Sequence, residues 1–153
     1  MNSNITSYLS DSKLTAISRN KLSTPILYIH KKGLLKGSIL DYGCGKGGDV
    51  KYLHTLGYKD CCGYDPNYQP VLPIDRFDTV LCTYVLNVIP CAIIRNDVIE
   101  TILKSCKGHA YVTVRNDANA LNGWTGKNTW QGLITLDYPV IHKTSSYIIY
   151  KIV

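Results

Sequence analysis

The sequence contains no apolar run long enough to cross a membrane. About 20 consecutive apolar residues are needed to span the hydrocarbon core of a bilayer, and the 153 residues hold no such stretch. Residues 1–6 (Met-Asn-Ser-Asn-Ile-Thr) also lack the basic and apolar regions of a signal peptide. We therefore expect a cytoplasmic protein that has no membrane partner.

The sequence also lacks the spacing of cysteine and histidine that is typical of metal sites. Its six cysteines include no Cys-x-x-Cys pair, and its four histidines are scattered along the chain. Most of the cysteines fall in predicted strands and core positions, where buried thiols in a reducing compartment are more plausible than disulfides. We expect neither a bound metal nor a disulfide framework.

Acidic residues are few, with 11 Asp and Glu against 17 Lys and Arg, which gives a net charge of +6. A positive balance attracts polyanions such as nucleic acids and speeds the encounter with them. The chain has no dense basic run, however, so a nucleic-acid partner and a merely soluble surface are both open readings. The high content of Asn, Lys, Ile and Tyr is typical of an AT-rich genome, such as that of a phage or a low-GC bacterium.

Strand and helix patterns alternate along the chain and are followed by strands alone. The predicted strands are 38–42, 59–64, 77–83, 108–114, 133–136, 138–142 and 146–153. Three helices are predicted: one capped by Ser23 or Thr24, one that begins at Asp49, and one at 91–105. Alternation of this kind predicts an α/β, Rossmann-like sheet that is mostly parallel and has an antiparallel C-terminal end. We expect one compact domain after a flexible N-terminus at residues 1–13.

Three segments have distinctive composition. The strand at 59–64 is apolar enough to be buried on both faces. Residues 68–76 are too short for the further helix and strand that larger members of this fold class carry there. Residues 115–132 are rich in Gly and Asn and read as a loop, and a loop of that length is usually functional or mobile.

A glycine-rich loop joins the first predicted strand to the helix that begins at Asp49. Residues 41–49 read Asp-Tyr-Gly-Cys-Gly-Lys-Gly-Gly-Asp, and Gly43 and Gly45 allow the backbone to approach a ligand without a Cβ clash. Such loops hold nucleotide-like ligands at the end of a Rossmann-type sheet. Asp41 precedes the first glycine by two residues, where an acid opposes a pyrophosphate but suits the ammonium of an amino acid. This favours S-adenosylmethionine over NAD as the cofactor.

Polar residues also follow the next two predicted strands. Asp65 lies about 20 residues beyond the glycine loop, where a carboxylate can accept hydrogen bonds from ribose hydroxyls. Because Asp-Pro-Asn at 65–67 is a good turn sequence, a plain turn residue is the alternative reading. The strand at 77–83 ends near Thr83, so Tyr84 and Asn87 are expected at the same edge of the sheet and are further candidate site residues.

Four blocks of the sequence carry a resemblance to a known family. They are Thr-Ala-Ile-Ser-Arg at 15–19, Asp-Tyr-Gly-Cys-Gly at 41–45, Gly-Tyr-Asp-Pro-Asn at 63–67 and Tyr-Val-Leu-Asn-Val-Ile at 84–89. They resemble class I S-adenosylmethionine-dependent methyltransferases, and more narrowly those associated with bacterial DNA phosphorothioation systems. The stretch 41–49 is also similar to the first motif of mRNA cap guanine-N7 methyltransferases, which are much larger.

The resemblance implies a methyltransferase domain at 14–153 and a set of site residues. It implies that Asp41, Gly43, Gly45 and Asp65 bind the cofactor, and it makes Arg19 and Asn87 candidates for the acceptor side or for the methionine end of the cofactor. With the neighbours of these residues, the expected cofactor contacts are Asp41, Gly43, Cys44, Gly45, Gly47, Asp49, Asp65, Pro66, Thr83 and Tyr84. The candidate catalytic residues are Arg19, Tyr84 and Asn87.

Several catalytic signatures are missing from the chain. The place after the 77–83 strand has no Asp/Asn-Pro-Pro-Tyr/Phe sequence, which weighs against amino-group methylation of DNA by the usual route. Pro90-Cys91 lies beyond the sheet edge at a helix start, so a cysteine nucleophile is a minor alternative. No metal-binding carboxylate set is evident. Methyl transfer from an activated sulfonium then depends mainly on positioning the acceptor.

The acceptor is predicted less sharply than the cofactor. The positive charge and the resemblance favour a nucleic acid or nucleobase. Residues of the 115–131 segment (Arg115, Asn116, Trp124 and Trp130) could help to position it, and Trp124 and Trp130 could stack on a base or merely cover the sheet edge. One alternative is a small-molecule methyltransferase. Another is a non-catalytic protein that binds S-adenosylmethionine or a partner chain.

Overall fold

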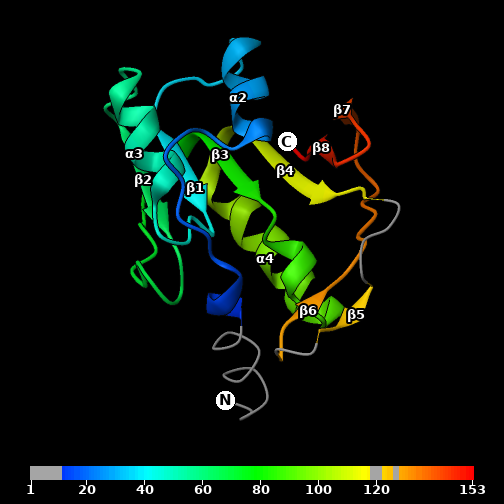
Figure 1. The fold of residues 1–153 in the computed structure, drawn as a ribbon. Coiled ribbons are helices and arrows are strands. Elements are labelled where there is room, and N and C mark those ends of the chain that lie inside the picture. The colour runs from blue at the N-terminus through cyan, green and yellow to red at the C-terminus, as the bar shows by residue number, and fades with distance from the viewer. Residues whose placement is uncertain (1–11, 118–121, 126–127) are drawn as a thin grey trace.

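A six-stranded sheet forms the centre of the computed structural model, which describes residues 12–117, 122–125 and 128–153 (Figure 1). The strand order is β2-β1-β3-β4-β8-β7. The strands are β1 (Ile39–Tyr42), β2 (Cys61–Tyr64), β3 (Phe77–Thr83), β4 (Cys106–Arg115), β7 (Val140–Lys143) and β8 (Tyr147–Lys151). The first four run parallel, whereas β8 is antiparallel to β4 and β7. The predicted mostly parallel sheet with an antiparallel end is confirmed.

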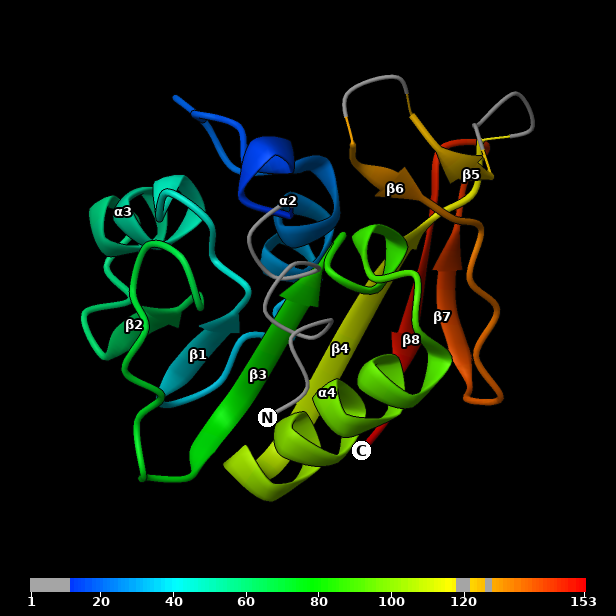
Figure 2. The same ribbon diagram turned by 90° about the horizontal axis from the view of Figure 1, so that it is seen from below.

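Helices cover both faces of the sheet (Figure 2). The helices α2 (Thr24–Lys31) and α3 (Gly48–Thr55) pack on one face, and α4 (Ala92–Ser105) packs on the other. Two 3-10 helices, η1 (Lys13–Thr15) and η2 (Leu86–Val88), are much shorter. Because successive strand side chains point to opposite faces, Ile39 joins the apolar cluster of α2 and α3, and Leu40 joins that of α4.

The elements up to β4 follow the sequence pattern closely. β3 has its predicted bounds, and β1, α3 and α4 begin within one residue of theirs. Ser23 is the N-cap of α2, Pro25 lies in its first turn, and Gly33 beyond its end has a φ of +65°. Of the N-terminus predicted to be flexible, residues 1–11 lie outside the described part of the chain, and Lys13 begins η1.

β2 is the edge strand of the sheet, so the prediction that it is buried on both faces is wrong. Of its four residues only Cys61 is buried. Burial on both faces requires neighbours on both sides, and β2 pairs with β1 alone among the described strands. The segment that follows, 68–76, contains no helix or strand, as its length predicted.

The outer side of β2 is covered by groups of the chain itself. The carbonyl oxygen of Cys61 accepts a hydrogen bond 2.6 Å long from Nε2 of His54. Asp65 and Gln69 exchange two backbone hydrogen bonds of 3.0 and 2.9 Å. These contacts satisfy backbone groups that an additional strand would otherwise pair with.

The segment 115–132 is not the plain loop that its composition predicted. It contains a hairpin of two-residue strands, β5 (Gly123–Trp124) and β6 (Trp130–Gln131), in which Trp124 is opposite Trp130. Residues 118–121 and 126–127 of this segment lie outside the described part of the chain. In Figure 2 the hairpin lies beyond the carboxyl end of β4, beside η2.

The strand predicted at 133–136 does not form. Ile134 and Leu136 pack against the apolar cluster on the α4 side of the sheet instead of pairing with a strand. The alternation of apolar and polar residues here reflects packing of Ile134 and Leu136 on the core. Periodicity alone does not distinguish such packing from strand pairing. The strand predicted at 138–142 is observed two residues later, as β7.

Candidate functional site

The glycine loop between β1 and α3 is held in a tight turn. Gly43 and Gly45 have φ values of +79° and +53°, which residues with a Cβ rarely adopt. The N–H groups of Gly43 and Cys44 donate to the carbonyl oxygen of Tyr64, at 2.7 and 2.9 Å. A Cβ on Gly43 would lie 2.2 Å from Cγ2 of Val85. The loop therefore packs closely between the end of β2 and the segment that follows β3.

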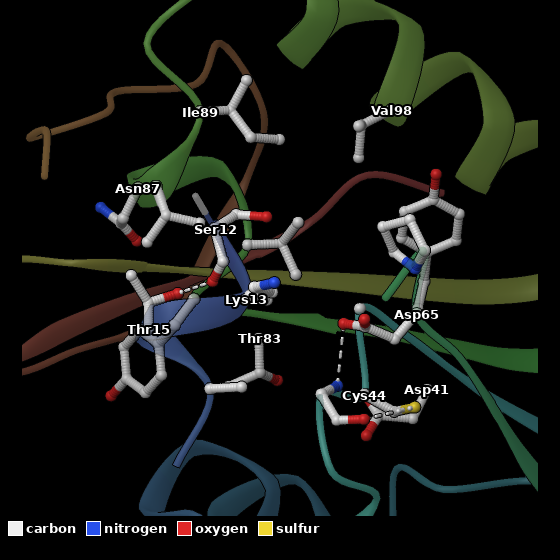
Figure 3. Close-up of a pocket in the computed structure, with 18 of the residues that line it drawn as sticks. Ser12, Lys13, Thr15, Asp41, Cys44, Asp65, Thr83, Asn87, Ile89 and Val98 are labelled. Atoms are coloured by element: carbon white, nitrogen blue, oxygen red, sulfur yellow. Dashed lines mark hydrogen bonds between the residues drawn. The ribbon is translucent and has the colours of Figure 1, made fainter. Parts of the chain in front are cut away.

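A cavity of about 530 Å³ opens where β1 and β3 end (Figure 3). Its volume lies within the range of about 300–1,000 Å³ that is typical of small-molecule sites. All but one of the site residues predicted from the sequence line it: Arg19, Asp41, Gly43, Cys44, Gly45, Asp49, Asp65, Pro66, Thr83, Tyr84 and Asn87. The exception is Gly47, which is the N-cap of α3 with a φ of +76° and is not part of the lining.

Asp41 is a buried acid in the wall of this cavity. It is 3% exposed, and its side chain has no hydrogen-bond partner within the part of the chain that the structure describes. Burial, and then the carboxylate of Asp49, raise the pKa of Asp41 to about 8, while the guanidinium of Arg19 opposes this shift. Because a nearby positive charge favours the ionised form of such a group, the position suits a cationic part of a ligand.

Asp65 has the turn role that the sequence left open, and part of its carboxylate still faces the cavity. Its Oδ1 accepts the N–H groups of Asn67 and Tyr68, at 2.8 and 3.1 Å, which is the turn role. Its Oδ2 accepts the N–H of Gly45 at 3.1 Å and so fixes the carboxylate against the glycine loop. An ionised carboxylate offers about four acceptor positions, and three are used here. One position is left for a ligand.

Arg19 and Asp49 fasten the segment before α2 to the start of α3. Nε of Arg19 lies 3.8 Å from Oδ2 of Asp49, and Oδ1 of Asp49 accepts the N–H of Ser23 at 2.7 Å. A Cβ on Gly48 would lie 2.9 Å from Cβ of Arg19, so the two segments touch. Asp49 lines the cavity, and its contacts with Arg19 and Ser23 also hold two of the segments around the cavity together.

Tyr84 is a strained residue at the end of β3. It is one of two non-glycine residues with positive φ in the described chain, with a φ of +60°, and such strain is often found at functional sites. Burial, and then Tyr147, raise the pKa of its phenol to about 12, while Arg19 opposes this. Beside it, the hydroxyl of Thr83 is buried and has no hydrogen-bond partner among the described residues.

Asn87 lines the cavity, but its side chain is engaged in the framework. Its Nδ2 donates to the carbonyl oxygen of Gly132 at 2.6 Å, and its Oδ1 accepts the N–H of Arg115 at 3.0 Å. The N–H of Gly132 in turn donates to the carbonyl oxygen of Asn87 at 2.8 Å. Both ends of the Asn87 amide therefore hold other segments in place, and its predicted role in the reaction stays a prediction.

The cysteines near the cavity are poor nucleophiles. Burial, and then the charge of Asp41, raise the pKa of the Cys44 thiol to about 12, so this thiol stays protonated at neutral pH. Cys91 is the N-cap of α4 and is not among the residues that line the cavity. The minor alternative of a cysteine nucleophile therefore gains no support.

Two further walls complete the cavity. One is η1, with Ser12, Lys13 and Thr15, which lies across the cavity from Asp65 (Figure 3); the sequence did not predict it, because it comes to the cavity through tertiary packing. The other consists of Arg115, one of the residues of the 115–131 segment expected to position the acceptor, and of Gln131, which was not singled out.

The described residues include no group of His, Cys, Asp and Glu that could hold a metal ion. In the same ranges of the chain, none of the helices is both long and apolar enough to span a bilayer.

Solved structures share this fold. The DhpI–SAH complex aligns with a TM-score of 0.54 and 12% identity, over 96% of this chain and 95% of that one. Magnesium protoporphyrin IX methyltransferase from Synechocystis PCC 6803, solved with bound SAH, aligns at 0.50 and 13%, over 99% and 87%. A third structure comes from work on the conversion of a disulfide bond into a thioacetal group during echinomycin biosynthesis. It aligns with a TM-score of 0.51 and 22% identity, over 64% of this chain and half of that one.

A search of the curated proteins finds no match to the sequence. A family model described as a methyltransferase domain, in contrast, matches residues 14–138. This range includes the glycine loop, Asp65, the strained end of β3 and the hairpin strand that reaches the cavity. Because the match covers most of the chain and the fold is that of solved methyltransferases, the chain belongs to the family of methyltransferase domains.

Proposed function

We propose that this chain binds S-adenosylmethionine in the cavity and transfers its methyl group to a nucleic acid or nucleobase. The observation that carries the cofactor part is the buried carboxyl of Asp41, which lies directly before the glycine loop. The ammonium at the amino-acid end of the cofactor provides a positively charged partner for this carboxyl. A pyrophosphate in the same place would instead keep Asp41 from ionising and would lie near the acids Asp49 and Asp65.

The opposite end of the cofactor is held at Asp65. The single acceptor position that remains on its carboxylate takes one ribose hydroxyl directly. This position is on Oδ2, the oxygen that also accepts the Gly45 N–H, so contact with both hydroxyls requires that one of the present hydrogen bonds be given up. The strand on the other side of Asp41 is β3, whose end brings the unpartnered hydroxyl of Thr83 and the residue Tyr84 into the cavity wall.

The residues around the cavity act by orientation. When bound, the sulfonium supplies an activated methyl group, which the acceptor attacks with its own electron pair while the C–S bonding pair stays on sulfur. The raised pKa of Tyr84, about 12, keeps its phenol protonated at neutral pH. Tyr84 is therefore a hydrogen-bond donor toward the acceptor rather than a general base. Holding the acceptor in line with the methyl group is the main contribution of the chain.

Size and charge support a large acceptor. A cavity of about 530 Å³ suits one small ligand, so an acceptor meets the methyl group from the mouth and lies largely outside. The net charge of +6 favours a polyanion. The resemblance to methyltransferases of DNA phosphorothioation systems supports DNA among the nucleic acids.

A small-molecule acceptor is the second candidate. One part of the cavity is lined by apolar side chains of Ile89, Ile94 and Val98, two of which are labelled in Figure 3. Such a wall suits an apolar acceptor that shares the cavity with the cofactor. One protein of the same fold is, by its name, a magnesium protoporphyrin IX methyltransferase.

Two measurements test these proposals. Titration calorimetry with S-adenosylmethionine should show binding that Asp65→Ala weakens, and no binding by the wild type at high micromolar concentration excludes the cofactor. A transfer assay with tritium-labelled cofactor against DNA, RNA and metabolite fractions identifies the acceptor class. Label in the metabolite fraction alone contradicts the nucleic-acid acceptor and favours the second candidate.

A further inference from the structure

Arg115 is the last residue of β4, and three side-chain hydrogen bonds hold its guanidinium. Its Nε and Nη2 donate to Oδ2 of Asp117, at 3.1 and 3.0 Å, and its Nη1 donates to Oε1 of Gln131 at 2.9 Å. Its backbone N–H donates to Oδ1 of Asn87. The guanidinium is thus fixed between the end of β4 and the β5–β6 hairpin, in a position that lines the cavity.

The guanidinium of Arg115 still has donors to offer. It carries five N–H groups in a rigid plane, and three are used within the described part of the chain. Asp117 holds the edge formed by Nε and Nη2, so the remaining N–H groups are on Nη1 and Nη2. A fixed plane with two donors is suited to a phosphate or to the hydrogen-bonding edge of a base.

Arg115 lies on the acceptor side of the site. Along the edge where the parallel strands end, the order of strands places Asp65, Asp41, Tyr84 and Arg115 in a row, after β2, in β1, after β3 and in β4. The two acids belong to the proposed cofactor half of this row. Arg115 is at the opposite end, and its charge acts on the phenol of Tyr84. Figure 3 likewise shows Asp65 and Asn87, the residue tied to Arg115, on opposite sides of the cavity.

We propose that Arg115 is an acceptor-binding residue of this methyltransferase, which holds a phosphate or base edge of a nucleic acid through its two remaining N–H groups. Asp117 and Gln131 orient the guanidinium, and Asn87 fixes the backbone from which it extends. The inference rests on the proposed function, because it needs the cofactor to occupy the side of Asp41 and Asp65. Beyond the proposed function, the inference names the residue that binds the acceptor and the acceptor groups that it binds, a phosphate or a base edge.

The test measures binding of a fluorescein-labelled single-stranded DNA of mixed sequence by protein saturated with S-adenosylhomocysteine. Fluorescence anisotropy gives the Kd for wild type, Arg115→Gln, Arg115→Lys and Asp117→Asn. The matched control is Lys59→Gln, which removes the same charge at an exposed position away from the cavity. Titration calorimetry with S-adenosylhomocysteine and thermal unfolding show whether each variant still folds and binds the product of the cofactor.

We expect both Arg115 variants to raise the DNA Kd about tenfold, the loss typical of a two-point arginine contact, with the affinity for S-adenosylhomocysteine unchanged. Lys59→Gln should change the DNA Kd less than twofold. Asp117→Asn makes the protein more positive, yet it should bind DNA more weakly because the guanidinium is no longer held. Salt titration identifies the contact: a phosphate contact lowers the salt slope of Arg115→Gln by about 0.7, and a base contact leaves it unchanged.

Three outcomes overturn the inference. DNA affinities of the Arg115 variants equal to that of Lys59→Gln exclude Arg115 as a contact. Tighter DNA binding by Asp117→Asn shows that net charge, and not a fixed guanidinium, governs binding. Binding of S-adenosylhomocysteine without any DNA binding by the wild type rejects the inference and leaves the cofactor proposal standing, whereas failure to bind S-adenosylhomocysteine rejects the proposed function itself.

Discussion

Replacement of Asp41 by asparagine is expected to stabilise the free protein and to remove its affinity for S-adenosylmethionine. Burial, and then Asp49, raise the pKa of Asp41 from 3.8 to about 8. Between these two values the unfolded chain releases the proton of this carboxyl and the folded chain retains it. The stability that Asp41 contributes is thus fully present below pH 3.8 and is lost as the pH rises toward 8. Asparagine has a similar shape and does not titrate.

The size of the effect follows from the pKa difference. One pKa unit corresponds to about 1.4 kcal/mol, so the difference between 3.8 and about 8 sets a ceiling near 5–6 kcal/mol. Local relaxation and water entry reduce such penalties considerably, and we expect Asp41→Asn to raise the free energy of unfolding by about 1–3 kcal/mol at pH 8. At pH 4 the two proteins should differ by less than about 0.5 kcal/mol, since Asp41 is then protonated in the folded chain.

Urea unfolding at pH 4, 6 and 8 measures the stability part of this prediction, and calorimetry measures the ligand part. Below pH 7 the amino group of the cofactor, with a pKa of about 7.7–8.0, is charged while Asp41 is still protonated. Binding should therefore release a proton, and the Kd of the wild type should fall by up to about tenfold between pH 6 and 7. In Asp41→Asn the residual affinity should not depend on pH in this range. Equal pH dependence of stability in both proteins, or undiminished affinity in the variant, refutes the reasoning.

Four further predictions concern other parts of the site. Asp65→Asn keeps an acceptor oxygen but loses the charge and should raise the cofactor Kd about tenfold in calorimetry; an unchanged Kd excludes the ribose role. Gly43→Ala places a Cβ against Val85 at a φ of +79° and should reduce the free energy of unfolding by about 2–4 kcal/mol. Part of that loss should return in a Val85→Ala background, and no recovery contradicts the steric explanation. Asn87→Ala breaks two buried hydrogen bonds and should destabilise the chain by about 2–3 kcal/mol, with the acceptor KM rising more than the cofactor Kd. Cys44, with a thiol pKa of about 12, should react with iodoacetamide at pH 8 far more slowly in the folded than in the unfolded chain, as mass spectrometry can follow.

The parts of the site that the sequence predicted are those with a local cause. Asp41 and Gly43 belong to one strand-and-turn unit, and the turn needs glycine because a Cβ there meets Val85. The bounds of β3 follow from a segment rich in apolar and β-branched residues between Arg76 and the strained Tyr84. In each case the residues that form the structure are close in the chain, so pattern and structure agree.

The parts that the sequence missed depend on contacts between distant residues. Asn87 was expected at the cavity because it follows β3, but its hydrogen bond with Gly132, 45 residues further along the chain, could not be predicted. Arg115 was a candidate for the acceptor side, but its hydrogen bonds with Gln131 and Asp117 could not be predicted either. β2 has the composition of a central strand, but its place at the edge is set by the order of the strands in the sheet. No local pattern encodes these relations.

The covered edge of β2 bears on how many strands the sheet needs on this side. An exposed strand edge invites pairing with other molecules and thus aggregation. Here the ring of His54 and the backbone of Gln69 occupy backbone groups of Cys61 and Asp65. The same Asp65 lines the cavity. At these two positions, a side chain and a short turn thereby make the hydrogen bonds that a further strand would make in a wider sheet.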